Sequence, residues 1–318
     1  MRKKTKNPLN KNPIIIVIMI LLAVYALSML VVLAWGLMIS FKNYPKDING
    51  LNNPVPDFLS FPSIKLSSGE MFNFWNYQRV FENVTAFKHK ASYYSAGSLQ
   101  TPSVMGNYWV YIYNTILYTG VGTLILSVVP AIGAYMCAKY KYKFSTVIYS
   151  IVVFVMVMPI VGNAPAMLDF LRKIGFYDTY VGHAIRQCSF TSMYFLVFYA
   201  FFSGMSDSYM EAAQMDGASQ LRVMLSIATP LAKNFITTVA LVLFVACWND
   251  YETPILYLPT KPNLAFGVHY MCTRGAGFLD RVPFRVASLM TLAIPSLILY
   301  IALNDKLMGN ISLGGIKE

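Results

Sequence analysis

The chain has 318 residues, of which 56% are hydrophobic, 15% aromatic and only 12% charged, and its mean hydropathy is +0.51. Soluble domains typically carry about twice this share of charged residues. The aromatic content excludes a disordered, collagen-like or coiled-coil chain. The composition therefore predicts an integral membrane protein.

The net charge of +11 is unevenly distributed along the chain. Five Lys and Arg fall within the first eleven residues, with no acidic neighbour, and three more lie in the segment 138–143, between two apolar stretches. Basic clusters beside apolar spans set the orientation of membrane proteins. The charge pattern therefore favours a lipid membrane as the partner over nucleic acid. The N-terminal cluster consists of Arg2, Lys3, Lys4, Lys6 and Lys11.

Uncharged stretches give the number of membrane crossings. A helix needs about 20 apolar residues to cross a bilayer, and five stretches without Asp, Glu, Lys or Arg can each hold one crossing. A sixth is expected from about Leu231 to Asn249, with Asp250 and Glu252 in its last turns, where acidic residues cost least. The sequence predicts an all-α membrane protein with six transmembrane helices. The five uncharged stretches are 12–41, 91–138, 144–168, 187–206 and 286–304.

The first apolar run, from Ile14 to Ile39, is too long for a cleaved signal peptide and predicts an uncleaved anchor. Its basic flank places the N-terminus in the cytoplasm, and six crossings return the C-terminus there. The expected division is a cytoplasmic N-terminus (1–13), a first crossing (14–40), an extracellular loop (41–107), a core with the other five crossings (108–303) and a cytoplasmic tail (304–318).

The inner segment 205–230 between the fourth and fifth crossings predicts two short helices joined at a glycine. Ser208 and Glu211 have the spacing of a capping box, and Gly217 suits the left-handed end of the first helix. Ser219 is expected to cap the second helix, and Pro230 marks the start of the next element. We call residues 208–228 the elbow. One face of its second helix is expected to carry Leu221, Met224, Leu225 and Ala228.

This segment resembles a known family. Glu211-Ala212-Ala213, Asp216-Gly217-Ala218 and Pro230-Leu231 are similar to the EAA signature of ABC importer permease subunits, most closely the maltose-transporter-like carbohydrate-uptake permeases. The resemblance covers about residues 70–318 and implies a type I importer fold with a cytoplasmic coupling helix. Further agreements are Asn76-Tyr77, Asn114-Thr115, Ala134-Tyr135, Ala138, Met158-Pro159, Trp248-Asn249 and the glycine-rich segment 309–317.

The resemblance implies a sugar importer in the cytoplasmic membrane of a bacterium. A second permease subunit would form a heterodimer with this chain, two ATPase subunits would dock on the elbows, and an extracellular solute-binding protein would deliver the sugar or oligosaccharide. Residues implied at the ATPase contact are Glu211, Ala212, Ala213, Asp216, Gly217 and Arg222.

No nucleotide, metal or catalytic motif occurs in the sequence. It has no G-x-x-x-x-G-K-[ST] segment, so ATP and Mg²⁺ are expected on the partner ATPases and no cofactor on this chain. It has no G-x-S-x-G and no HExxH, and its four cysteines form no pair at metal spacing. We therefore expect a transport subunit rather than an enzyme.

Solute contacts are predicted at Trp248, Asn249, Asp250 and Asn114, with Asn163 and Tyr135 behind them, because sugars are bound by polar groups beside aromatic rings. An alternative is that Trp248 and the acids only mark the outer membrane interface. In the outer loop 260–283, contact with the binding protein is predicted at Gly267, Arg274, Gly275 and Gly277.

Three other functions stay open. A permease of the same class for another solute, such as an amino acid, peptide or polyamine, fits nearly as well. A secondary transporter or channel would be expected to have internal repeats or broken helices at the membrane midplane. A membrane enzyme would need a catalytic cluster, which the sequence does not offer.

Overall fold

The computed structural model describes residues 13–41, 74–90, 93–95, 98–100, 103–106, 108–140, 142–158, 162–274 and 282–308. The basic N-terminal cluster, most of the predicted extracellular loop and the glycine-rich segment 309–317 lie outside these residues. The chain divides into two compact units, residues 1–82 with 271–291 and residues 83–270 with 292–318.

The first unit contains α1 (Pro13–Ser40), most of α3 (Trp75–Ala86) and the first turns of α14 (Val282–Met308). As predicted, α1 is an uninterrupted apolar helix of 28 residues, about 42 Å long. Its end is held by α3, since Asn76 Nδ2 donates to the Ser40 carbonyl at 2.8 Å and the hydroxyls of Tyr77 and Ser40 are 2.7 Å apart. The Asn-Tyr pair thus satisfies a helix-end carbonyl that has no partner within α1.

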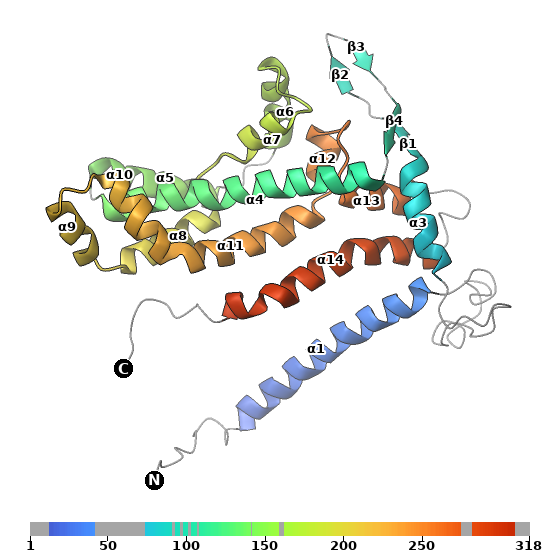
Figure 1. The fold of residues 1–318 in the computed structure, drawn as a ribbon, viewed down its shortest axis with the longest axis horizontal. Helices are drawn as coiled ribbons and strands as arrows, with labels where there is room; N and C mark the ends of the chain where they lie inside the picture. Colours follow the sequence, from blue (N-terminus) through green and yellow to red (C-terminus); the bar gives the residue numbers. More distant parts are fainter. Residues whose placement is uncertain are drawn as a thin grey trace. The chain divides into compact units, whose positions relative to one another are not determined.

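The second unit is built around α4 (Tyr108–Lys139), which packs against α8 (Met193–Gly204) and α11 (Thr229–Asn249) (Figure 1). Phe195, Phe198 and Phe202 recur at helical spacing on α8 and are almost fully buried. They form the aromatic centre of a core to which α4 contributes Ala131, Ala134 and Tyr135 and α11 contributes Ala232, Val239 and Leu243.

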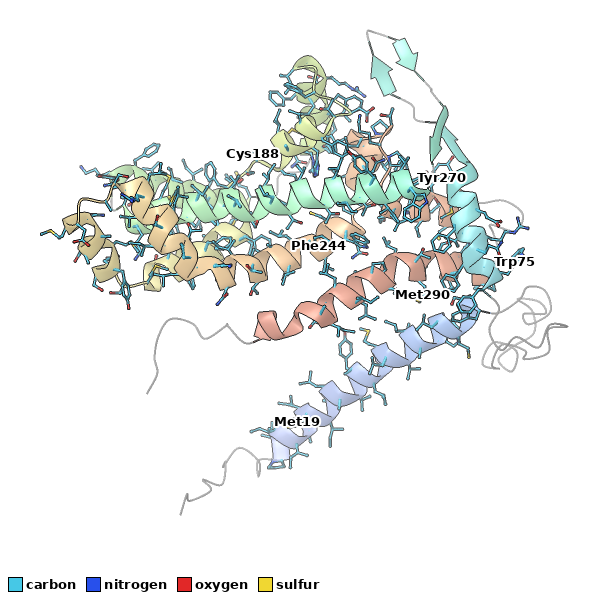
Figure 2. All side chains as sticks on the ribbon, viewed as in Figure 1. Met19, Trp75, Cys188, Phe244, Tyr270 and Met290 are labelled. Atoms are coloured by element: carbon cyan, nitrogen blue, oxygen red, sulfur yellow. The ribbon has the colours of Figure 1, made fainter. Side chains whose placement is uncertain are left out.

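Among the residues that the structure describes, four helices are long and apolar enough to cross a membrane, at 13–40, 109–139, 220–249 and 282–302. The predicted third and fourth crossings correspond to shorter helices, α5 (Lys143–Val157, 15 residues) and α8 (12 residues). α5 ends before Met158-Pro159, because a residue that precedes proline is disfavoured in a helix. α8 begins late because residues 188–192, which include Cys188 (Figure 2), are not helical.

Short helices gather at the two ends of α4 (Figure 1). At one end lie α6 (Asn163–Lys173), α7 (Tyr180–Gln187), α12 (Glu252–Tyr257) and α13 (Leu264–Arg274). At the other end lie α9 (Ser208–Met215), α10 (Gln220–Val223) and the π-helical turn η2 (Met224–Ala228). The elbow and the predicted solute contacts on α11 are therefore at opposite ends of the unit.

Two features differ from the prediction. First, the otherwise helical chain has four short strands within the predicted loop 41–107: β1 (Phe87–Lys90) pairs antiparallel with β4 (Ser103–Gly106), and β2 (Tyr93–Ser95) with β3 (Ser98–Gln100). The Ser, Gly and Pro residues of this stretch, which favour turns, separate the four short strands.

Second, the acids that follow the fifth crossing are outside its helix. α11 ends at Asn249, Asp250 has an extended backbone, and Glu252 begins the separate helix α12. The Asp250 carboxylate accepts hydrogen bonds from the Tyr118 hydroxyl at 2.5 Å and from the backbone N–H of Thr253 at 3.1 Å. These bonds to α4 and to the next turn replace a continuation of the helix.

Candidate functional site

The glycine of the elbow ends α9 as predicted. Gly217 has a φ of 82°, which is in the left-handed region that favours glycine. The N–H of Ala218 donates to the carbonyl of Ala213 at 3.0 Å, and that of Gly217 to Gln214 at 3.0 Å. These two bonds form a Schellman motif, so the bend between the two arms of the elbow is set by backbone geometry.

The second arm continues directly into a membrane helix. Ser219 caps it as predicted, since its side chain accepts the backbone N–H of Arg222 at 3.4 Å. α10, η2 and α11 follow without a break, so that 220–249 is one candidate crossing. The π-helical turn lies where Pro230 removes a backbone donor, and the Thr229 hydroxyl donates to the Met224 carbonyl at 2.8 Å. A displacement of the arm therefore acts directly on α11.

The predicted capping box is wrong. Asp207 precedes α9, whereas Ser208 is its first residue and bonds through its hydroxyl to that of Ser206 at 2.7 Å. The Asp207 carboxylate does not cap α9 either, because it accepts a bond from Lys139. The start of the elbow is thus fixed by a long-range ion pair instead of a local cap.

Lys139 links the end of α4 to the start of the elbow. Its side chain is 6% exposed, and Nζ donates to the Met205 carbonyl at 2.6 Å and to Asp207 Oδ1 at 2.7 Å. Met210 is the buried residue of α9 and lies beside Tyr135 of α4, whose ring packs edge-on against Phe202 of α8. The first arm is therefore attached to both α4 and α8.

The outer face of the elbow is apolar and exposed. Met215 is 87% exposed, and Tyr209, Leu221 and Leu225 are each more than half exposed. Among the residues implied at the ATPase contact, Ala213 packs against the core. The remaining five are also exposed: Glu211, Ala212, Asp216, Gly217 and Arg222. An apolar patch rimmed by polar residues is typical of a surface that binds another protein.

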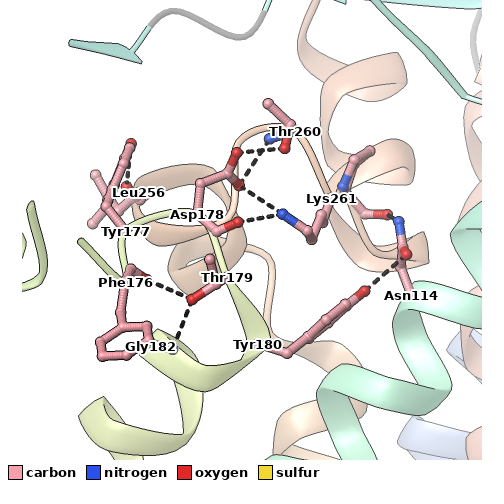
Figure 3. Close-up of polar contacts among 11 residues, drawn as sticks. Asn114, Phe176, Tyr177, Asp178, Thr179, Tyr180, Gly182, Leu256, Thr260 and Lys261 are labelled. Atoms are coloured by element: carbon pink, nitrogen blue, oxygen red, sulfur yellow. Dashed lines mark hydrogen bonds and ion pairs between the residues drawn. The ribbon is translucent and has the colours of Figure 1, made fainter. Parts of the chain in front are cut away.

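At the opposite end of α4, Asn114 joins three segments (Figure 3). It is buried, its Nδ2 donates to the Pro262 carbonyl at 2.9 Å, and its Oδ1 accepts the Tyr180 hydroxyl at 2.8 Å. The hydroxyl oxygen of Thr115 accepts a further hydrogen bond from the backbone N–H of Leu264 at 2.8 Å. The Asn-Thr pair thus positions α7 and the loop before α13.

Asp178 makes a second link in the same region (Figure 3). Its carboxylate accepts the hydroxyl and the backbone N–H of Thr260, and Lys261 Nζ lies 3.8 Å from Oδ1 and also donates to the Asp178 carbonyl. Its φ of 58° is left-handed, a conformation that Asp tolerates. Burial raises the pKa of the Asp178 carboxyl, while Thr260 and Lys261 act in the opposite direction.

The predicted solute residues do not form one cluster. Trp248 donates its Nε1–H to the Leu292 carbonyl at 3.1 Å and stacks on Phe244, and Asn249 is exposed and donates to the Val245 carbonyl at 2.9 Å. Asp250 bonds to α4 as described above. Tyr135 is 21 residues beyond Asn114 on α4, about 32 Å away, and belongs to the core beside the elbow.

Two residues predicted to contact the binding protein, Gly267 and Arg274, lie in α13. Gly267 is buried in α13, where a Cβ would lie 2.9 Å from the ring of Tyr111. A glycine is needed there for close packing. Arg274 is the last residue of α13, and Gly275 and Gly277 lie outside the described residues.

Sequence reasoning missed the link between Lys139 and Asp207 and the polar groups on α7. Arg186 donates to the Thr253 hydroxyl at 3.4 Å and lies over the ring of Tyr257, and His183 stacks on Tyr118 with ring centroids 4.2 Å apart. A basic residue at the end of one span and an acid at the start of the elbow are a usable signal for the first link. No short motif identifies the others, because their partners are distant in sequence.

Residues 127–268, which include the elbow and α11, match the family described as binding-protein-dependent transport system inner membrane component. The match assigns this central stretch, which is less than half of the chain, a likeness to the inner membrane components of such transport systems.

Curated relatives agree with this assignment. The melibiose/raffinose/stachyose import permease MelC of Bacillus subtilis (strain 168) is 25% identical over 222 residues, which cover 67% of this chain and 76% of that protein. The sn-glycerol-3-phosphate transport system permease UgpE of Escherichia coli (strain K12) is 24% identical over 197 residues, 61% of this chain and 69% of that protein.

A solved structure supports the same fold. A chain of a bacterial ABC transporter involved in the import of the acidic polysaccharide alginate superposes with a TM-score of 0.66 at 22% identity, over 93% of this chain and 96% of that chain. The superposition thus covers more of the chain than the family match does.

Proposed function

We propose that this protein is one of two permease subunits of an ATP-driven importer that moves a sugar or oligosaccharide into the cytoplasm. The elbow carries this proposal. It presents an exposed apolar face, is attached to α4 and α8 through Lys139 and Met210, and continues into α11. An element with these three properties transmits a force applied at the membrane surface to the membrane helices.

ATPase subunits are the proposed source of that force. Exposed apolar side chains with a charged rim suit the groove of another protein, and the glycine bend keeps the two arms at a fixed angle. Glu211, Ala212, Asp216, Gly217 and Arg222 would contact the ATPase, and ATP and Mg²⁺ would be bound there and not on this chain. Ala213 would support the arm from inside.

The remaining partners are proposed from the family. Its description as binding-protein-dependent supports an extracellular solute-binding protein, and a second, non-identical permease subunit would complete the pathway. The names of MelC and UgpE support a hydroxyl-rich solute, a sugar in the first case and a phosphorylated polyol in the second. A permease of the same class for a non-sugar solute is the alternative.

The proposed topology has six crossings, with both termini in the cytoplasm. α1, α4, α11 and α14 supply four of them. The third crossing is α5, which is a shorter helix. The fourth crossing consists of α7 and α8, interrupted at residues 188–192.

Reconstitution tests the proposal. Vesicles containing the two permeases, the ATPase and the binding protein are expected to accumulate a labelled oligosaccharide only when ATP is supplied on the elbow side. Accumulation of glycerol 3-phosphate or an amino acid instead of the oligosaccharide would identify the alternative. Uptake by this chain without an ATPase would contradict the proposal.

The role of the bend is tested by Gly217→Leu. A Cβ at Gly217 meets no atom within 4 Å, so the substitution changes the backbone and not the packing. A left-handed Leu costs about 1–2 kcal/mol, which straightens the bend and is expected to abolish uptake and transport-coupled ATP hydrolysis while insertion continues. Gly204→Leu is the matched control, because Gly204 also has open space but lacks the positive φ. Normal uptake by Gly217→Leu would refute the proposed role.

A further inference from the structure

The fourth crossing contains a non-helical segment whose depth in the membrane can be determined from α4. This segment, residues 188–192, separates α7 from α8 and runs beside α4. His183 Nε2 lies 3.2 Å from the Tyr118 carbonyl oxygen, and Gln187 Nε2 lies 3.8 Å from the Cβ position of Gly122. The Cβ of Phe190 lies 3.4 Å from the Cβ position of Gly133. The segment therefore follows α4 from the level of Gly122 to that of Gly133.

The level of Gly122 is inside the hydrocarbon core. The candidate crossing on α4 is 109–139, and the core is crossed by about 20 residues of helix. Any window of about that length within 109–139 includes 120–128, so Gly122 is inside the core whichever window is used. Cys188 directly follows Gln187 and is therefore at membrane depth, within a part of the chain that is not helical.

The backbone of this segment is incompletely hydrogen-bonded. Cys188 and Ser189 donate their N–H groups to Ile185 and Gln187, and Thr191 donates to the Ser189 hydroxyl at 3.2 Å. The described residues supply no donor to the carbonyl oxygens of Cys188 and Ser189. Ser192 Oγ is buried and has no partner in the same described part of the chain.

An apolar lipid environment does not suit this arrangement. Unpaired backbone groups cost several kcal/mol each in hydrocarbon, so non-helical backbone at this depth occurs only where protein buries it or water reaches it. The chain does not bury it fully, because Cys188 is exposed. The hydroxyls of Ser189 and Thr191, 2.7 Å apart, add further polar groups.

We propose that residues 188–192 form a wall of the water-filled path along which a hydrated, hydroxyl-bearing solute crosses the membrane. The carbonyl oxygens of Cys188 and Ser189 then bond to water or to solute hydroxyls. The inference rests on the proposed function, since it assigns a segment of this chain to the route of the imported solute.

Cys188 is a natural probe of this path. The test uses a protein in which Cys137, Cys247 and Cys272 are replaced by Ala, reconstituted with its partners, with ATP-driven uptake measured on the same vesicles. A charged methanethiosulfonate is expected to modify Cys188, to inhibit uptake, and to react more slowly when solute-loaded binding protein and ATP are present. The control carries Leu27→Cys in addition to Cys188→Ala, because Leu27 is in the middle of α1 and 62% exposed on an apolar helix.

Modification of Cys188 at least about tenfold faster than of the Leu27 variant supports the proposal, since a thiol in lipid is rarely ionised and the thiolate is the reacting form. Reaction of Cys188 only with a membrane-permeant maleimide, at the rate of the control, would overturn it in favour of a lipid-facing segment. Reaction with neither reagent would overturn it in favour of a protein interface. If uptake proceeds with ATP in either case, only this inference fails; uptake independent of ATP contradicts the proposed function instead.

Discussion

At the scale of single residues, the most consequential contact at the start of the elbow is made by the buried side chain of Lys139. A lysine is rarely buried unless its charge is paired, and here Nζ bonds to the Asp207 carboxylate and the Met205 carbonyl. Asp207 is itself 53% exposed, so water weakens the attraction between the two charges. The main effect of the pair is therefore to fix the position of the first arm.

Replacement of Lys139 tests this role. Lys139→Met removes a donor from both oxygens, and hydrogen bonds to charged groups contribute about 1.5–3 kcal/mol. Uptake is expected to fall at least about tenfold, which corresponds to about 1.4 kcal/mol, while the protein still inserts. Lys143→Met is the control, since Lys143 is exposed and begins α5 one turn later. Equal uptake by the two variants would show that the ion pair does not position the elbow.

Asp178 gives a pH-dependent prediction. Burial raises the pKa of its carboxyl above the ordinary value of 3.8. The folded state then binds the proton more tightly than the unfolded chain. The protonated Asp178 carboxyl therefore stabilises the fold fully at a pH below 3.8, and this contribution is lost as the pH rises through the folded pKa. Asp178→Asn keeps a residue that tolerates left-handed φ and cannot ionise.

We expect the wild type to lose stability relative to Asp178→Asn as the pH is raised from about 3.5 to 7. The measurement is the thermal unfolding midpoint of both proteins in detergent across this range. The comparison cancels the titration of every other group that the two proteins share. Parallel curves would mean that burial does not disfavour the ionised form of Asp178.

At the scale of elements, α9 has two faces with different tasks. Met210 is 5% exposed against α4 and α8, whereas Met215, five residues later, is 87% exposed. One methionine thus packs against the core on one face of α9, and another is available to a partner on the other face.

Alanine substitution separates these tasks. Met210→Ala creates a cavity and is expected to lower the free energy of unfolding by about 2–5 kcal/mol, seen as a lower unfolding midpoint. Met215→Ala is expected to change it by less than about 0.5 kcal/mol but to weaken binding of the ATPase, measured by co-purification. If Met210→Ala left the midpoint unchanged, or Met215→Ala left ATPase binding unchanged, the assignment of the two faces would be incorrect.

At the scale of the whole molecule, the number of crossings determines on which side of the membrane the elbow lies. Four helices in the described part of the chain are long and apolar enough to span the membrane. With α5 and α8, the expected total is six. A cytoplasmically active fluorescent protein fused after Lys141 or after Glu318 is expected to be fluorescent. A phosphatase active only outside the membrane is expected to be active when fused within 165–179. Activity of the phosphatase at Lys141 would reverse the orientation and contradict the coupling role of the elbow.

The sequence alone determined those features that depend on local chemistry. Uncharged length predicted α1 and the end of α4 nearly to the residue. The glycine at 217, the cap at 219 and the proline at 230 predicted the second half of the elbow. These signals are reliable because a left-handed φ, a missing backbone donor and the thickness of a bilayer each restrict a short segment independently of the rest of the fold.

Only the tertiary structure decided what distant segments do to one another. The predicted capping box of Ser208 and Glu211 is replaced by Asp207, which precedes α9 and pairs with Lys139, 68 residues earlier in the chain. Asn114 and Asp250 bond inside the fold, and the fourth crossing lost its helix at 188–192 beside Gly122 and Gly133. Such outcomes depend on which polar groups meet after packing, and the energy of each contact is set by partners that no local pattern specifies.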